Sequence, residues 1–443
     1  MNTPIIDFIK KYNKNKSIRL HMPGHKGLLK GAKFDITEID GADSLFDANS
    51  IIDESEKNLS SLYNTYFSVY STQGSSLSIM TMLALVKDYA LANGKKPLIL
   101  ATRNAHASFL NGVALLDLDV EWAVERGDCF LSSTVNCEEL EKQFSKKKNL
   151  PVAVYLTSPD YLGNVLPIEK IAGVCKKHGV LCVVDNAHGS YLNFLDEKIH
   201  PINLGADMCA DSAHKTLPVL TGGAYLHIAK DFTFFNKQQV KSKMKIFAST
   251  SPSYLTLCSM DSANKYLNDN KCAYITCKEK VDNLKEFLLS LGHKLVGDEP
   301  LKISIDCNHF GYKGSDLAKI LARNKIIAEY FDSAFIVLMF SPFNMGKDYK
   351  NVKKAFSKIQ KLDAIIRPTF STLNPKRTMS IREALFAKSE SVSVENAEGK
   401  ILSKTNVSCP PAVPIMFSGE VIDKNAIEIM KYNQIERVEV VIK

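Results

Sequence analysis

The sequence lacks any apolar run that is long enough to cross a membrane. Its longest uninterrupted run, Ala334 to Phe340, has seven residues, whereas a spanning helix needs about 20. The segment Met1 to His21 is too polar to hold the apolar part of a secretory signal. We therefore expect a cytoplasmic protein that has no membrane partner.

Cysteine and tryptophan patterns that would indicate other classes of protein are also missing. None of the ten cysteines forms a CxxC pair, so the sequence predicts reduced thiols and no metal site. The single tryptophan and the lack of interleaved aromatic and basic residues argue against nucleic-acid binding. The formal net charge of +8 is spread along the chain, and its lysine clusters at 146–148 and 241–245 are typical of solvated faces.

The chain has 443 residues, of which 45% are hydrophobic, and this length favours two domains. Between residues 97 and 230, apolar strand-like runs alternate with helical runs, a pattern that indicates an α/β fold with a sheet buried on both faces. Beyond residue 290 the pattern favours a smaller α+β domain, with strands at 301–305, 326–330 and 335–340 and helices at 316–324 and 351–362. We predict an N-terminal arm at 1–50, a large domain with a mostly parallel sheet at 51–290, and a C-terminal domain at 291–443.

Residues with reactive or ligand-binding side chains follow three of the predicted strands, at the edge where ligands bind in open α/β sheets. Gly74-Ser75-Ser76 begins a helix and either cradles a phosphate or serves as an ordinary cap. Asp185 ends an apolar strand and is either a capping carboxylate or a buried anion that pairs with a cationic ring. Lys215 is either a snorkelling side chain or a partly buried nucleophile with a lowered pKa. His106 either caps the helix that follows it or stacks on a ring.

Taken together, these residues match what pyridoxal 5′-phosphate (PLP) requires. This cofactor needs phosphate ligands, a stacking partner, a carboxylate at the pyridine nitrogen and a lysine for its aldehyde. A carboxylate that keeps the ring nitrogen protonated makes the ring a better acceptor of electrons. We therefore predict a PLP site.

At this point the sequence resembles a known family, the Orn/Lys/Arg decarboxylases, which are PLP enzymes with the aspartate aminotransferase-like fold (fold type I). The resemblance extends from His21 to Glu420. It rests on six ordered motifs: His21-Met22-Pro23-Gly24-His25-Lys26-Gly27, Arg103-Asn104-Ala105-His106, Thr157-Ser158-Pro159-Asp160-Tyr161-Leu162-Gly163, Asp185-Asn186-Ala187-His188-Gly189, Ser212-Ala213-His214-Lys215-Thr216-Leu217-Pro218 and Ser249-Thr250-Ser251-Pro252-Ser253-Tyr254.

The resemblance implies a role for each matched residue. Lys215 binds the cofactor aldehyde, Asp185 pairs with the pyridinium nitrogen, Ala187 packs on one ring face and His106 stacks on the other. The implied phosphate ligands are Ser75, Ser76, Ser212 and His214. His25 and the acidic stretch from Asp40 to Asp47 would lie near the substrate entrance, and the family implies homodimers or multiples of dimers with shared active sites.

The sequence departs from the family pattern at several positions around these motifs. The family often has Asp-Glu-Ala-His-Gly-Ala-His, where this chain has Asn186, Ser190 and Tyr191, and Ala107 replaces a lysine. The late segment from Cys409 to Glu420 resembles a Pro-Pro-Gly-Ile-Pro … Pro-Gly-Glu element, with Ala412 for glycine and Ser418 for proline. The chain looks like the small branch without an N-terminal wing domain, which includes arginine decarboxylases.

We expect decarboxylation of a basic L-amino acid to its amine and CO2, as in polyamine biosynthesis, with arginine, lysine and ornithine all open as substrates. Besides His25, the tentative substrate residues are acidic groups for the distal cation: Asp43, Asp47, Glu329 and Glu420. An alternative is another fold type I reaction, such as transamination or elimination, in which Arg367 or Arg382 would hold the substrate carboxylate. A regulatory protein without activity is a further alternative, and the intact Lys215, Asp185 and His106 argue against it.

Overall fold

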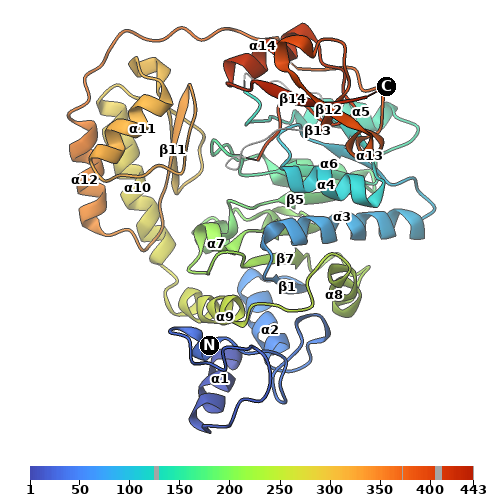
Figure 1. Ribbon diagram of the computed structural model, residues 1–443, viewed down its shortest axis with the longest axis vertical. Coiled ribbons are helices and arrows are strands. Elements are labelled where there is room, and N and C mark those ends of the chain that lie inside the picture. Colours follow the sequence, from blue (N-terminus) through green and yellow to red (C-terminus); the bar gives the residue numbers. More distant parts are fainter. Residues whose placement is uncertain (124–128, 372, 405–411, 443) are drawn as a thin grey trace. The chain divides into compact units, whose positions relative to one another are not determined.

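The computed structural model describes residues 1–123, 129–371, 373–404 and 412–442 (Figure 1). The chain folds into two compact units. The first unit comprises Met1–Ile99, Cys137–Ser158 and Pro167–Cys272, and the second comprises Leu100–Asn136, Pro159–Leu166 and Ala273–Lys443. These units differ from the predicted linear division at residues 50 and 290, because the chain passes between them several times.

Five consecutive strands of the seven-stranded sheet, ordered β1-β7-β6-β5-β4, belong to the first unit. Strands β4, β5 and β6 run parallel, whereas β7 is antiparallel to both β6 and β1. Nearly every residue of these strands is buried, which confirms the sheet predicted from the near-continuous apolar runs. Their bounds are Phe67–Ser71 for β1, Ala153–Thr157 for β4, Leu181–Asp185 for β5, Met208–Asp211 for β6 and Ala224–Ile228 for β7.

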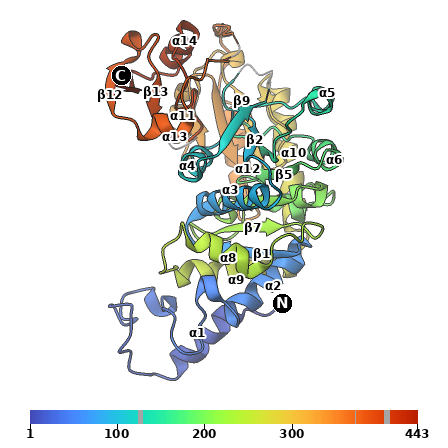
Figure 2. The ribbon, with the colours of Figure 1, turned by 90° about the vertical axis from the view of Figure 1, so that its right-hand side faces the viewer.

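Helices pack on this sheet, and the N-terminal helix packs on two of the other helices of the first unit. Helix α3 (Gly74–Ala92) contacts β5, β6, β7 and β1. The predicted N-terminal helix is present as α1 (Pro4–Lys14) and packs on α2 (Ile51–Tyr63) and α9 (Tyr254–Asp269), as Figure 2 shows. Its residues Ile5 and Ile9 are fully buried, so α1 is an integral part of the first unit. The other helices of this unit are α5 (Cys137–Lys146), α6 (Ile168–Lys177), α7 (Ala213–Thr216) and α8 (Lys237–Lys245).

The second unit contains an antiparallel sheet ordered β10-β11-β9-β8. The predicted strand at 326–330 is wrong except at its last residue, since β10 covers Tyr330–Phe331, and the predicted helix at 351–362 is α12, Gly346–Phe356. The remaining strands are β8 (Lys294–Val296), β9 (Lys302–Asp306) and β11 (Phe335–Met339), and the flanking helices are α10 (Ala273–Ser290) and α11 (Gly314–Arg323). Because α10 packs on α12, β8 and β9, it belongs to this unit rather than to the preceding one.

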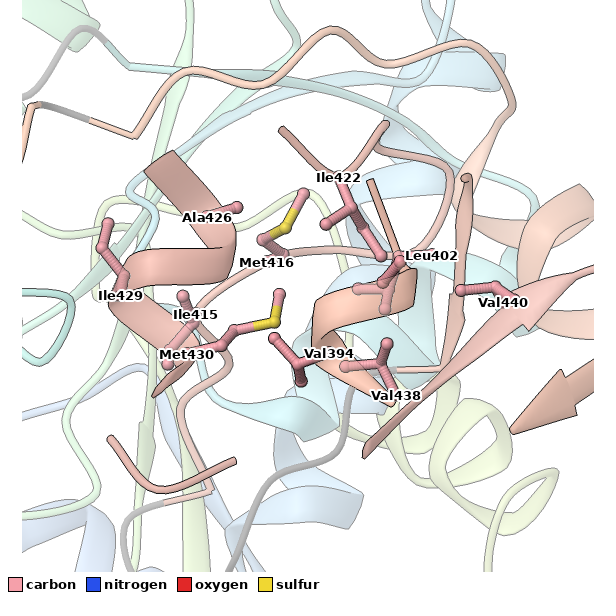
Figure 3. Packing of buried hydrophobic residues seen from close by; sticks show 11 residues of the cluster. Val394, Leu402, Ile415, Met416, Ile422, Ala426, Ile429, Met430, Val438 and Val440 are labelled. Atoms are coloured by element: carbon pink, nitrogen blue, oxygen red, sulfur yellow. The ribbon is translucent and has the colours of Figure 1, made fainter. Parts of the chain in front are cut away.

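The same unit holds a three-stranded antiparallel sheet ordered β12-β14-β13. Its core packs Val394, Leu402, Met430 and Val438 among other apolar side chains (Figure 3). The elements around this sheet are α13 (Ile381–Phe386), β12 (Ser389–Ser393), β13 (Leu402–Lys404), α14 (Lys424–Tyr432) and β14 (Arg437–Val441). The second unit also includes α4 (Ala107–Leu116) and β3 (Asp119–Trp122), whereas β2 (Leu98–Ala101) contains Ile99, the residue at which the first segment of the first unit ends. Among the described residues, no helix combines the length and the apolar character needed to cross a membrane.

Candidate active site

The parallel strands β5 and β6 bring two of the predicted residues to one edge of the sheet. Strand β5 ends at Asp185, which pairs in register with Ala210 of β6. Strand β6 ends one residue later, at Asp211, and leads through Ser212 into the four-residue helix α7, which contains Lys215. The carboxylate and the lysine thus follow adjacent strand ends, as the alternating pattern predicts.

The Asp185 carboxylate is buried and receives hydrogen bonds from neutral donors. It accepts from the backbone N–H of Ala187 at 3.1 Å and from the hydroxyl of Tyr155 at 3.2 Å. Burial raises the pKa of Asp185 to about 6, although the positive charge of Lys215 acts in the opposite direction. A cation next to this carboxylate would relieve the cost of its burial, and this is what a protonated pyridine nitrogen provides.

Lys215 lies beyond the end of β6, and its Nζ is 3.1 Å from Nε2 of His188. The predicted partial burial of this lysine is wrong for the single chain, where Lys215 is exposed because the short helix α7 carries it past the edge of the sheet. His188, in contrast, is only 5% exposed. The sequence motif that begins at Asp185 contains His188, but no role was predicted for it. Its position three residues after a buried carboxylate is the feature of the sequence that could have indicated a role.

Hydroxyl groups lie at a helix N-terminus where the phosphate site is predicted. Helix α3 begins at Gly74, and its N-cap residue, Gln73, makes no side-chain cap. The hydroxyl of Ser212 donates to that of Ser75 at 2.7 Å, so the turn after β6 meets the first turn of α3. Ser76 is the third residue of α3. The segment therefore lies inside the helix rather than capping it by a side chain, and its N-terminal dipole favours an anion.

The turn before β7 contains two glycines that allow a close approach to the start of α3. Gly222 has φ of +93°, and a Cβ there would lie 2.9 Å from the carbonyl oxygen of Thr72. The carbonyl of Gly222 accepts from the N–H of Gly74 at 2.7 Å. His214 donates from Nδ1 to the carbonyl of Gly223 at 2.9 Å, which fixes its ring, and burial lowers the pKa of His214. The buried carboxylate, the lysine amine, the serine hydroxyls and the helix N-terminus together fit PLP.

His106 lies in the second unit, where it caps helix α4. Its Nδ1 accepts from the backbone N–H of Ser108 at 3.0 Å. The helix-cap interpretation is therefore confirmed, and the role of His106 as a stacking residue stays a prediction. Ala187, the residue implied for the other ring face, is half-buried two residues after Asp185 in the first unit.

The tentative substrate residues have partners inside the chain. The carboxylate of Asp43 is buried and accepts from the N–H groups of Ser50 at 2.9 Å and Ile52 at 2.8 Å, where α2 begins. His25 is 3.1 Å from the carboxylate of Asp35. Asp43 therefore accepts hydrogen bonds at the N-terminus of a helix, and the substrate roles of Asp43 and His25 stay predictions.

The carboxylate of Glu420 also has hydrogen-bond partners within the chain. It is fully buried and forms two hydrogen bonds with the guanidinium of Arg103, at 2.7 and 3.0 Å, and it also accepts from the N–H of Phe417. The guanidinium in turn lies over the rings of Trp122 and Phe417. This bidentate pair lies within the second unit and stabilises it, and the substrate role of Glu420 stays a prediction.

The motif around Ala412 is described only in part, since Cys409 to Pro411 lie outside the described residues. Ala412 has φ of +54°, a left-handed conformation that favours glycine, at the position where the resemblance implies glycine. Its carbonyl accepts from the N–H of Ala107 at 2.9 Å, next to His106.

The chain is similar to proteins of a known family. Residues 3–291 match the family model of the major domain of the Orn/Lys/Arg decarboxylases, and residues 363–439 match that of the C-terminal domain. Arginine decarboxylases of Halalkalibacterium halodurans and Bacillus subtilis are each 25% identical to this chain, over 97% of it and 93% of the relative.

Solved structures show the same fold. The constitutive lysine decarboxylase of E. coli is similar with a TM-score of 0.80 and 16% identity, over 100% of this chain and 82% of that one. The lysine decarboxylase of Francisella novicida has a TM-score of 0.82 at 15% identity, over 99% and 81%. A cysteine desulfurase from Thermococcus onnurineus is also similar, with a TM-score of 0.56 at 16% identity, over 81% and 91%. These likenesses confirm the fold type I architecture, and the two family matches show that the chain belongs to the Orn/Lys/Arg decarboxylase family of amino-acid decarboxylases.

Proposed function

We propose that this protein uses PLP to decarboxylate a basic L-amino acid, and that arginine is the first substrate to test. The observation that carries the proposal is that a buried carboxylate, Asp185, and a lysine, Lys215, follow the ends of two adjacent strands, β5 and β6. Membership of the family supports the reaction class, and the two arginine decarboxylases that are similar along nearly the whole chain support the choice of arginine.

The chain's own residues would hold the cofactor at three points. Lys215 would take the aldehyde, Asp185 the ring nitrogen, and Ser75, Ser212 and His214 the phosphate. When bound, PLP withdraws the electron pair that remains on the substrate as CO2 leaves. Asp185 contributes by favouring a charged ring nitrogen, because a buried carboxylate without a cation is costly.

The reaction also needs a proton at the substrate Cα after CO2 has left. Lys215 Nζ and His188 Nε2 lie 3.1 Å apart, within hydrogen-bond distance, so a proton can pass from one to the other. His188 is buried, whereas Lys215 is exposed. We assign proton delivery to this pair.

No observation favours transamination. The two arginines that could have held a substrate carboxylate have other partners: Arg367 binds the carboxylate of Asp306 at 2.6 Å, and Arg382 donates to the carbonyl of Ala114 at 2.8 Å. Both contacts lie within the second unit, so neither guanidinium points to a role in that reaction.

A homodimer in the cytoplasm also belongs to this proposal. Large apolar side chains cluster in an N-terminal segment of the first unit, where Ile18, Leu20 and Leu28 are each more than 80% exposed. A second copy of the chain would remove this apolar surface from water. Light scattering coupled to gel filtration should give twice the mass of the chain, and a monomer at micromolar concentration would contradict the assembly. The described cysteines are free thiols, which suits a reducing compartment.

The test is amine production by the purified protein loaded with PLP. L-arginine, L-lysine and L-ornithine would be incubated separately and the products identified by mass. We expect one amine and CO2 in equal amounts, and loss of both in Lys215→Ala but not in Lys142→Ala, an exposed lysine on α5. Borohydride reduction followed by peptide mapping should place the cofactor on Lys215. Bound PLP without any amine would refute decarboxylation of these substrates.

A further inference from the structure

A second buried carboxylate, Asp211, lies directly behind the lysine turn. It ends β6, four residues before Lys215, and is 0% exposed. Its Oδ1 accepts from the Asn186 side-chain amide at 2.7 Å, and its Oδ2 is 3.0 Å from Nε2 of His200. His227 Nε2 lies 3.4 Å from the same Oδ2. All four residues belong to the first unit and are fully buried, so this cluster lies outside the set of residues that would touch the cofactor.

The hydrogen bonds of His200 show what kind of site this is. Its Nδ1 accepts from the backbone N–H of Ile202 at 3.3 Å and therefore carries no proton. In the neutral ring the proton is then on Nε2, which donates to Asp211. His200, Cys209 and Asp211 are close enough together to surround a metal ion. A metal on Nε2 would, however, move the proton to Nδ1, against the N–H of Ile202, so the geometry indicates a hydrogen-bonded anion.

The surroundings keep Asp211 ionised. Although burial acts in the opposite direction, the interactions with His200 and His227 hold the pKa of Asp211 well below its usual range. His227 is itself fixed, with Nδ1 at 2.7 Å from the hydroxyl of Ser68 and its ring stacked on Tyr63. A carboxylate with this many fixed partners is a rigid point in the fold.

Through Asn186, this rigid point connects the two strand ends of the candidate site. Asn186 directly follows Asp185, and its backbone N–H donates to the carbonyl of Ala210 at 2.9 Å while its side chain donates to Asp211. Its Oδ1 faces Gly189, where a Cβ would lie 2.0 Å from that oxygen. Space around the amide is therefore limited, and a second carboxylate at position 186 would meet Asp211 at hydrogen-bond distance. This accounts for the departure of Asn186 from the glutamate that the resemblance implies.

We propose that Asp211 is a positioning residue that, together with the Asn186 amide, holds the strand ends carrying Asp185 and Lys215 in the register that PLP requires. The proposal rests on the proposed function for its PLP readout. It also makes a specific claim about positions 186 and 211. One of them must carry a carboxylate and the other an amide, and either position can carry either group.

The test compares four proteins: the wild type, Asn186→Asp, Asp211→Asn and the double variant. Each single change either opposes two buried carboxylates or leaves the Nε2–H of His200 facing an amide, and we expect PLP affinity to fall about tenfold or more, as for contacting residues in one network. The double variant restores one carboxylate and one amide and should recover most of that loss. As a matched control, the exposed Asn268–Asp269 amide–carboxylate pair, exchanged in the same way, should leave PLP affinity unchanged.

Two further measurements separate positioning from general stability. The pH midpoint of the absorbance of lysine-bound PLP should fall in Asp211→Asn, because a negative charge near the site has been removed, whereas a purely structural residue would not move it. Nitrogen-15 NMR of the cofactor-free protein should show His200 protonated at Nε2. Equal losses in the single variants that simply add in the double variant would overturn the proposal, as would wild-type PLP affinity and pH midpoint in Asp211→Asn.

The comparison of the four proteins still tests the proposal if one variant does not fold or if the wild type binds no PLP. If Asn186→Asp does not fold, the double variant must still bind PLP more tightly than Asp211→Asn. If the wild type binds no PLP, the proposed function fails, and the urea stability of the same four cofactor-free proteins decides the pairing instead. Recovery of stability in the double variant would then support the pair, and additive loss would refute it.

Discussion

Asp185 gives the most direct quantitative prediction, because its environment penalises its charge in the cofactor-free protein. Burial raises its pKa from an ordinary value of 3.8 to about 6. The difference of about 2 pH units corresponds to about 3 kcal/mol, at about 1.4 kcal/mol per unit. Since the folded pKa is the raised one, this contribution to stability is fully present below pH 3.8 and is lost as the pH rises through about 6. The Asp185→Asn variant has no such group to titrate.

The assay is urea unfolding of the cofactor-free wild type and of Asp185→Asn at a series of pH values from 4 to 7.5. We expect the stability of the wild type relative to the variant to fall by about 3 kcal/mol across this range. Asp261, whose pKa burial also raises to about 6, is present in both proteins, so its titration cancels in the difference. The variant should nevertheless bind PLP more weakly, because an amide cannot neutralise a pyridinium nitrogen.

A difference in stability that does not change with pH would refute this reasoning, since it would mean that Asp185 titrates alike in the folded and unfolded chain. A constant offset between the two proteins is compatible with it, because asparagine cannot accept from both Ala187 and Tyr155 in the way that a carboxylate does. Only the slope between about pH 4 and pH 6 tests the claim that burial raises the pKa.

Four further predictions follow from individual contacts. Asp43→Ala removes the acceptor where α2 begins and should cost about 1–2 kcal/mol in urea unfolding, with the KM for the amino acid unchanged. Glu420→Gln leaves Arg103 buried without its counter-charge and should cost about 3–5 kcal/mol, and an unchanged melting temperature would contradict the pairing. His188→Gln should lower kcat while PLP still binds, as seen by absorbance. Ala412→Gly should raise stability by up to about 1 kcal/mol, because alanine is unfavourable at φ of +54°.

The parts of the fold that were predicted correctly are those in which the sequence carries its own burial signal. Strands β4 and β5 are continuous apolar runs buried on both faces, and they lie in the region from 97 to 230 where such strands were predicted. The predicted strand at 326–330 was apolar too, yet Ile327 is 82% exposed, so composition alone was misleading there. Strand β12, Ser389–Ser393, is mostly polar, and it is defined by pairing with β14 rather than by its own residues.

The candidate site was predictable where chemistry and position along the chain coincide. Asp185 and Lys215 stand out because a charged residue at the end of an apolar strand is rare and costly. Contacts between residues that are far apart in the chain could not be predicted from the sequence. Glu420, for example, is 317 residues from Arg103, which it binds. The same holds for Asp43, because nothing in the sequence shows that its carboxylate accepts the backbone N–H groups where α2 begins.

The two aspartates that end β5 and β6 show most clearly where sequence reasoning stops. Each follows an apolar run, and the pattern gives no reason to treat them differently. In the structure, Asp211 is balanced from within by His200 and His227, which lower its pKa, whereas the hydrogen bonds described for Asp185 come from neutral donors and its pKa is raised. His227 reaches Asp211 only because β7 pairs with β6, and that pairing is not encoded in either strand alone. The fold thus stabilises the charge of one carboxylate itself and leaves the other to be stabilised by a bound cation, which is the physical reason to place the ring nitrogen of PLP at Asp185.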